Sequence, residues 1–118
     1  HPKFKQAILE SQYNSTELSL KGVMPVRLLK NKFYQEIKSL EESCATKEVL
    51  LACLGKGRAR KGMLLGDLDE GELEIGQGCA LIDNLPKVCE CVDRLLSEYN
   101  SCIRKIHNSF IVPGGENE

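Results

Sequence analysis

The chain shows no excess of either charge, no long apolar run and no leader peptide. Its 16 basic and 17 acidic residues leave a formal net charge of −1, which excludes strong long-range attraction to nucleic acid or to an anionic membrane. No apolar stretch approaches the roughly 20 residues of a membrane-spanning helix. His1 is followed by no signal-peptide core, and no initiator methionine is present. We therefore expect a cytoplasmic piece of a longer polypeptide, with no nucleic-acid or membrane partner.

Metal-binding and disulfide signatures are also missing, although the chain has six cysteines. No C-x-x-C pair occurs, and Cys89 and Cys91 would face different sides of a helix. The two histidines, His1 and His107, lie near the chain ends and match no zinc spacing. We predict no metal site and six reduced thiols that pack as small apolar groups: Cys44, Cys53, Cys79, Cys89, Cys91 and Cys102.

No set of residues in the sequence forms a self-sufficient catalytic centre. A hydrolase needs a nucleophile, a base and an orienting group, but only His107 is an internal histidine and no G-x-S-x-G motif occurs. The basic cluster at residues 55–62 fails the G-x-G-x-x-G fingerprint because Arg60 occupies the third glycine position. We predict no catalytic residue, and we interpret the cluster as a solvated loop neutralised by the acids that follow. Contact with a phosphate is the alternative.

Apolar spacing predicts a mainly helical chain with one short strand. The strand covers residues 16–21, with Leu18 and Leu20 on its buried face, and its pairing partner is expected outside this chain. The helices are expected at residues 2–12, 26–43, 46–54 and 86–108.

The segment at residues 66–82 is not explained as ordinary packing. It begins with a glycine-bracketed acidic turn, in which the carboxylates are more typical of turn formation than of acid–base or cation chemistry. It ends with a run of small residues, Gly76 to Ala80, which lets another backbone or a flat ligand come close. A loop leading into a tightly packed helix is the plainer interpretation.

Three blocks, in order, resemble a known family. They are HPKFKQAI at residues 1–8, PVRLLKNKF at 25–33, and GKGRARKGM at 55–63 continuing through GDLDEGELEIGQ at 66–77. Together they resemble the C-terminal part of FMN-dependent 2-nitropropane dioxygenase-like proteins, which include nitronate monooxygenase and enoyl-acyl carrier protein reductase II. The sequence departs from the expected pattern where Gly78 and Cys79 stand in place of a larger apolar residue.

The resemblance implies a C-terminal fragment of an α/β TIM barrel with its small helical substrate-side domain. Residues 1–15 would form the last barrel helix, 16–67 the substrate-side domain, 68–108 a return segment and C-terminal helix packing on the barrel, and 109–118 a flexible tail. Gly76, Gln77 and Gly78 would lie beside the FMN. The remaining barrel, with the family's catalytic histidine, would lie in the rest of the same polypeptide.

The function implied by the resemblance is FMN-dependent reduction of an enoyl-acyl carrier protein in fatty-acid synthesis, with NADH or NADPH as electron donor and an acyl thioester as substrate. Nitronate monooxygenase is the alternative within the family. A free-standing helical interaction module without catalysis is the alternative of another class. The resemblance does not decide whether the protein forms a homodimer.

Overall fold

The computed structural model describes residues 1–109 and contains two compact units, His1–Asn84 and the described part of Leu85–Glu118. The first unit contains α1 (Pro2–Leu9), strands β1 (Thr16–Ser19) and β2 (Val26–Leu29), α2 (Lys32–Glu42) and α3 (Lys47–Leu54). It also contains η1 (Arg60–Leu64), a π-helix, and η2 (Gln77–Leu81), a 3₁₀-helix. The second unit is α4 (Val88–Ser109) with the residues leading into it. The predicted tail lies, apart from Ser109, outside the described residues.

The predicted strand finds its partner within the chain, so the expectation of an absent partner is wrong. β1 and β2 form an antiparallel pair in which Thr16 lies opposite Leu29 and Ser19 opposite Val26. The predicted helix at 26–43 therefore begins only at Lys32, after the N-cap Asn31, whose side chain accepts a hydrogen bond from the Tyr34 N–H. Branched and apolar residues such as Val26 suit a strand as well as a helix, and pairing decides between them.

The burial predicted for the strand at residues 16–21 is right for Leu20, which lies just after β1, and wrong for Leu18. Leu20 is 2% exposed, whereas Leu18 is 42% exposed. Two residues separated by one position in a regular strand share a face. Leu20 has a φ of 56°, in the left-handed region that a bulky residue rarely adopts. This backbone rotation takes Leu20 off the face of Leu18 and places it in the core.

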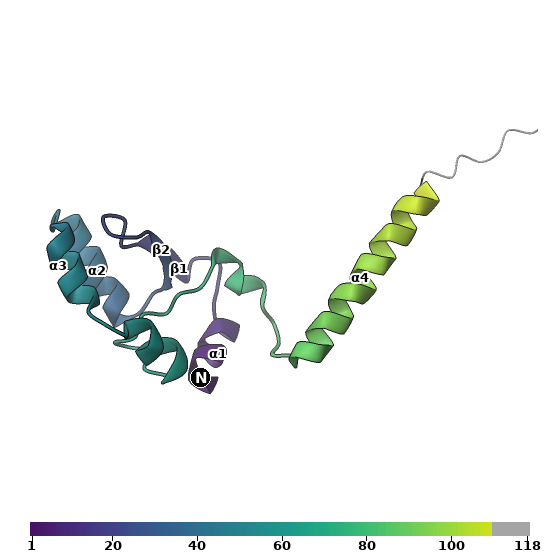
Figure 1. Ribbon diagram of the computed structural model, residues 1–118, viewed down its shortest axis with the longest axis horizontal. Coiled ribbons are helices and arrows are strands. Elements are labelled where there is room, and N and C mark those ends of the chain that lie inside the picture. The colour runs from purple at the N-terminus through teal and green to yellow at the C-terminus, as the bar shows by residue number, and fades with distance from the viewer. Residues whose placement is uncertain (110–118) are drawn as a thin grey trace, which may run out of the picture. The chain divides into compact units, whose positions relative to one another are not determined.

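The core of the first unit forms where α2 and α3 pack beside the hairpin (Figure 1). The helix α3 agrees with the sequence prediction: it follows Thr46 and ends before Gly55, whose φ of 64° is a backbone conformation that favours glycine. The core is built from Leu20, Leu28, Phe33, Tyr34, Ile37 and Leu50.

The predicted C-terminal helix is confirmed as the 22-residue α4, none of whose residues is buried. Its apolar side chains recur at helical spacing and are all exposed: Val88, Val92, Leu95, Leu96, Tyr99, Ile103 and Ile106. No described helix is both long and apolar enough to cross a membrane.

The cysteines are free thiols, as predicted, but their predicted packing is wrong for most of them. Cys79 is buried and Cys53 is half-buried, whereas Cys44, Cys89, Cys91 and Cys102 are exposed. Three of the four exposed thiols lie on α4, where no core forms around the helix.

Candidate functional site

The acidic stretch after η1 is a tight turn held by its own first carboxylate. One oxygen of Asp67 accepts hydrogen bonds from the backbone N–H groups of Asp69 at 3.2 Å and Glu70 at 2.9 Å. The Gly71 N–H closes the turn onto the Asp67 carbonyl at 3.2 Å. The acids thus build a turn, as the sequence indicated. Within residues 1–109, no three histidine, cysteine or acidic side chains gather as a metal site.

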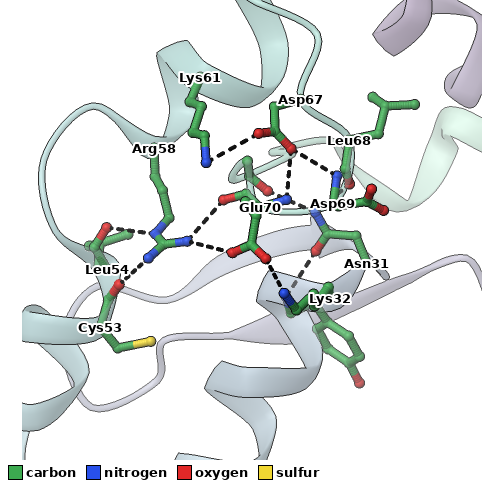
Figure 2. Close-up of polar contacts among 12 residues, drawn as sticks. Asn31, Lys32, Cys53, Leu54, Arg58, Lys61, Asp67, Leu68, Asp69 and Glu70 are labelled. Atoms are coloured by element: carbon green, nitrogen blue, oxygen red, sulfur yellow. Dashed lines mark hydrogen bonds and ion pairs between the residues drawn. The ribbon is translucent and has the colours of Figure 1, made fainter.

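Asn31 joins this turn to the start of α2 (Figure 2). Its amide nitrogen donates to the carbonyls of Leu68 and Gly71, each at 2.8 Å. Its amide oxygen accepts from the Tyr34 N–H at 2.9 Å. The side chain therefore caps the helix and holds the turn at once. The sequence interpretation missed this role because it placed Asn31 inside a helix.

Arg58 is a structural clamp, and the prediction of a wholly solvated basic cluster is wrong for it (Figure 2). Its guanidinium donates to the carbonyls of Cys53, Leu54 and Glu70 at 2.9–3.1 Å, and it lies 3.6 Å from a Glu70 carboxylate oxygen. It also stacks over the Phe33 ring, 4.6 Å from the centroid. Each of the three guanidinium nitrogens thus donates to a backbone carbonyl, which orients the group toward the protein rather than toward a phosphate.

The predicted neutralisation of the basic cluster is confirmed for Arg58 and Lys61, the two of its cations that form ion pairs with the acids that follow. Lys61 lies 3.1 Å from Asp67, and Lys32 contacts Glu70. Donation from the Glu70 N–H, and then from Lys61, holds the pKa of Asp67 below its ordinary 3.8. The Lys32 ammonium holds the pKa of Glu70 below its ordinary 4.5. Both carboxylates are therefore ionised at neutral pH.

These two lowered pKa values predict a loss of stability in acid. A group with a lowered folded-state pKa binds protons more readily when unfolded, so its contribution is present above its ordinary pKa. That contribution is lost as the pH falls below 4.5 for Glu70 and below 3.8 for Asp67. We expect the urea midpoint of the complete polypeptide to fall between pH 6 and pH 3. An Asp67→Asn, Glu70→Gln double variant should show a smaller fall, and an equal fall would contradict the assignment.

On the side away from α2, the backbone of the turn at Gly71 lies directly against the backbone of η1 at Gly62. A Cβ added at Gly71 would lie 2.2 Å from the Gly62 Cα, and one added at Gly62 would lie 2.8 Å from the Glu72 carbonyl oxygen. Side chains cannot occupy such distances, so both positions require glycine. The acidic turn is therefore held between η1 on one side and the start of α2 on the other.

After the turn, the chain runs along the free edge of β2. The Leu29 N–H donates to the Leu73 carbonyl at 2.9 Å, and the Ile75 N–H donates to the Arg27 carbonyl at 3.1 Å. Leu28 and Glu74 form the isolated bridge between them. Residues 73–75, here called the return strand, are hydrogen-bonded to the edge of β2 that faces away from β1. The hairpin therefore fixes the position of the chain just before Gly76.

The predicted site residues Gly76, Gln77 and Gly78 follow directly and are exposed. Gly76 caps η2 with a φ of −69°, a conformation open to any residue. A Cβ added at Gly76 or Gly78 would meet nothing within 4 Å. Packing among the described residues therefore does not explain either glycine. Cys79, the next residue, turns inward and is buried.

Solved structures with a similar fold exist, whereas no family model and no curated protein sequence matches the chain. FabK from Thermotoga maritima superposes with a TM-score of 0.75 at 26% identity, over 93% of this chain and 35% of that one. Its M276A mutant gives a TM-score of 0.69 at 24% identity, over 93% and 31%. The chain thus spans about a third of the proteins it matches. It is mostly helical with one two-stranded sheet, and it has the fold of a fragment of the FabK TIM-barrel protein.

Proposed function

We propose that this chain is the C-terminal portion of an FMN-dependent oxidoreductase, an NAD(P)H-dependent enoyl-acyl carrier protein reductase of fatty-acid synthesis. The observation that carries the proposal is the likeness to FabK over 93% of the chain. FabK is enoyl-acyl carrier protein reductase II, a TIM-barrel FMN enzyme. The three sequence blocks support an FMN-dependent oxidoreductase of the wider family, which includes this reductase.

Gly76 and Gly78 fit a place beside a flat cofactor. Both lack side chains, both are exposed, and the space where a Cβ would stand is open. A glycine backbone can approach a planar ring more closely than any other residue. FMN, when bound, would relay reducing equivalents from the nicotinamide to the 2-enoyl thioester. This chain would supply one wall of that site, with Gln77 between the two glycines, and no catalytic residue.

The exposed stripe of α4 supports a larger polypeptide rather than a free-standing module. Its seven apolar side chains follow the a, d and e positions of a heptad, which is wider than the a and d seam of a coiled coil. A stripe of this width suits packing on a broad apolar surface, and left uncovered it promotes aggregation. The rest of the polypeptide, including the FMN barrel, is the proposed cover.

The experiment is to express the complete polypeptide from its whole coding region and to measure bound FMN by absorbance. We expect a yellow protein, and about tenfold weaker FMN binding in Gly76→Ala and Gly78→Ala, because each added methyl enters the space left for the ring. Gly22→Ala, in the exposed hairpin loop, is the control and should bind FMN normally; its added Cβ would lie 3.4 Å from a Leu50 side-chain carbon. A protein without flavin absorbance would contradict the proposal.

Nitronate monooxygenase remains the second candidate, because the sequence blocks resemble both enzymes and Gly78 and Cys79 depart from the expected pattern. A steady-state assay separates the two. Reduction of a 2-enoyl thioester by NADH or NADPH supports the reductase. Oxidation of an alkyl nitronate with oxygen, without nicotinamide, would replace it.

A further inference from the structure

We propose that Asn31 is the positioning residue of the segment formed by Gly76, Gln77 and Gly78, with no contact of its own to cofactor or substrate. The identity of what that segment faces rests on the proposed function. The positioning itself rests on hydrogen bonds among described residues.

The first link is the amide of Asn31, which acts across a long separation in sequence. It donates two hydrogen bonds of 2.8 Å to the carbonyls of residues 37 and 40 positions further along, Leu68 and Gly71. The Phe33 N–H, two residues after Asn31, donates to the Asp69 carbonyl at 3.0 Å. The start of α2 thus holds the acidic turn at three carbonyls, those of Leu68, Asp69 and Gly71.

The second link is the short stretch between Gly71 and Gly76. Only four residues separate them, and Leu73 is fully buried while its carbonyl and the Ile75 N–H are bonded to β2. An extended chain of this length has little slack, because each residue spans about 3.3 Å. The stretch that leads to Gly76 is thus held at one end by the turn and along its length by β2, and loss of the hold on the turn loosens one of these two restraints.

Helix capping alone does not account for the choice of asparagine. The cap uses only the amide oxygen, which accepts from the Tyr34 N–H, and serine caps a helix about as well. The two donations to the turn need the amide nitrogen, which serine and aspartate lack. Asn31→Ser thus keeps the cap acceptor and removes the hold on the turn without adding charge.

The experiment compares hydrogen exchange in the complete polypeptide for peptides covering residues 72–78. We expect these amides to exchange about tenfold faster in Asn31→Ser, because two hydrogen bonds that restrain the turn are lost. Ile37→Val removes one methylene from the core on α2 and is the matched control for a general loss of stability. It should leave exchange at 72–78 close to that of the unmodified protein.

Unchanged exchange in Asn31→Ser, or an equal increase in Ile37→Val, would overturn the inference. FMN affinity is the second readout, and we expect it to fall about tenfold in Asn31→Ser and to be unchanged in Ile37→Val. If FMN binds and its affinity is equal in the two variants, Asn31 does not position the segment for the cofactor. If exchange changes as expected in a protein that binds no FMN, the positioning stands and the proposed function fails.

Discussion

Replacing Gly71 with alanine is expected to destabilise the His1–Asn84 unit by at least about 3 kcal/mol, a loss reached only by severe core or backbone disruption. The new Cβ would lie 2.2 Å from the Gly62 Cα, 2.3 Å from the Asp67 carbonyl oxygen and 2.6 Å from the Gly62 N. All three are backbone atoms, so no side-chain rotation can relieve the clash. The backbones of η1 and the acidic turn would have to separate. The Asp67 carbonyl would also have to move away from residue 71, which would break the hydrogen bond that closes the turn.

The measurement is a urea titration of the complete polypeptide. Gly76→Ala is the matched control, because the same substitution there meets nothing within 4 Å and has an ordinary φ of −69°. We expect the unfolding free energy of the control to change by less than about 0.5 kcal/mol. Equal midpoints for the two variants would show that the backbone crossing is not as close as described. We therefore expect Gly76→Ala to lower FMN binding without lowering stability, and Gly71→Ala to lower stability.

Replacing Arg58 with alanine is expected to lower the unfolding free energy by about 2–4 kcal/mol. The change removes donations to three backbone carbonyls, and hydrogen bonds from a charged donor contribute about 1.5–3 kcal/mol each before solvent replaces some of them. It also removes the guanidinium from the Phe33 ring. Arg58→Lys should recover little, because an ammonium cannot reach three carbonyls in different directions.

Arg60 in the same basic cluster is the matched control for Arg58. It is exposed, so its replacement by alanine should change stability by less than about 0.5 kcal/mol. Thermal or urea unfolding of the complete polypeptide measures both. Equal losses at the two positions would mean that charge, rather than the directed hydrogen bonds of Arg58, stabilises this region.

Much of the helical structure follows from local sequence. Thr46 and Gly55 bracket α3, the long apolar stripe defines α4, and Asp67 beside glycine and acidic residues defines the turn. Each of these signals acts within a few residues, through a glycine that ends a helix, apolar periodicity or a side chain bonded to a nearby N–H. The mainly helical class could therefore be predicted without knowledge of tertiary contacts.

The structure corrects the prediction where two distant segments compete for the same residues. Val26–Leu29 has helix-compatible spacing, but β1 pairs with one edge and the return strand with the other, so these residues become a strand. The sequence predicts Arg58 to be one of four solvated cations. In the structure it contacts the Phe33 ring and two carbonyls at the end of α3 instead.

By itself, the sequence determined a mainly helical chain with a basic loop followed by acids, a carboxylate-held turn and a run of small residues that begins at Gly76. Tertiary structure alone decided which glycines are structural. Gly62 and Gly71 are required because two backbones cross there, whereas Gly76 and Gly78 face open space. The residues next to a glycine do not reveal whether another backbone packs against it, because that contact depends on how segments far apart in the chain fold together.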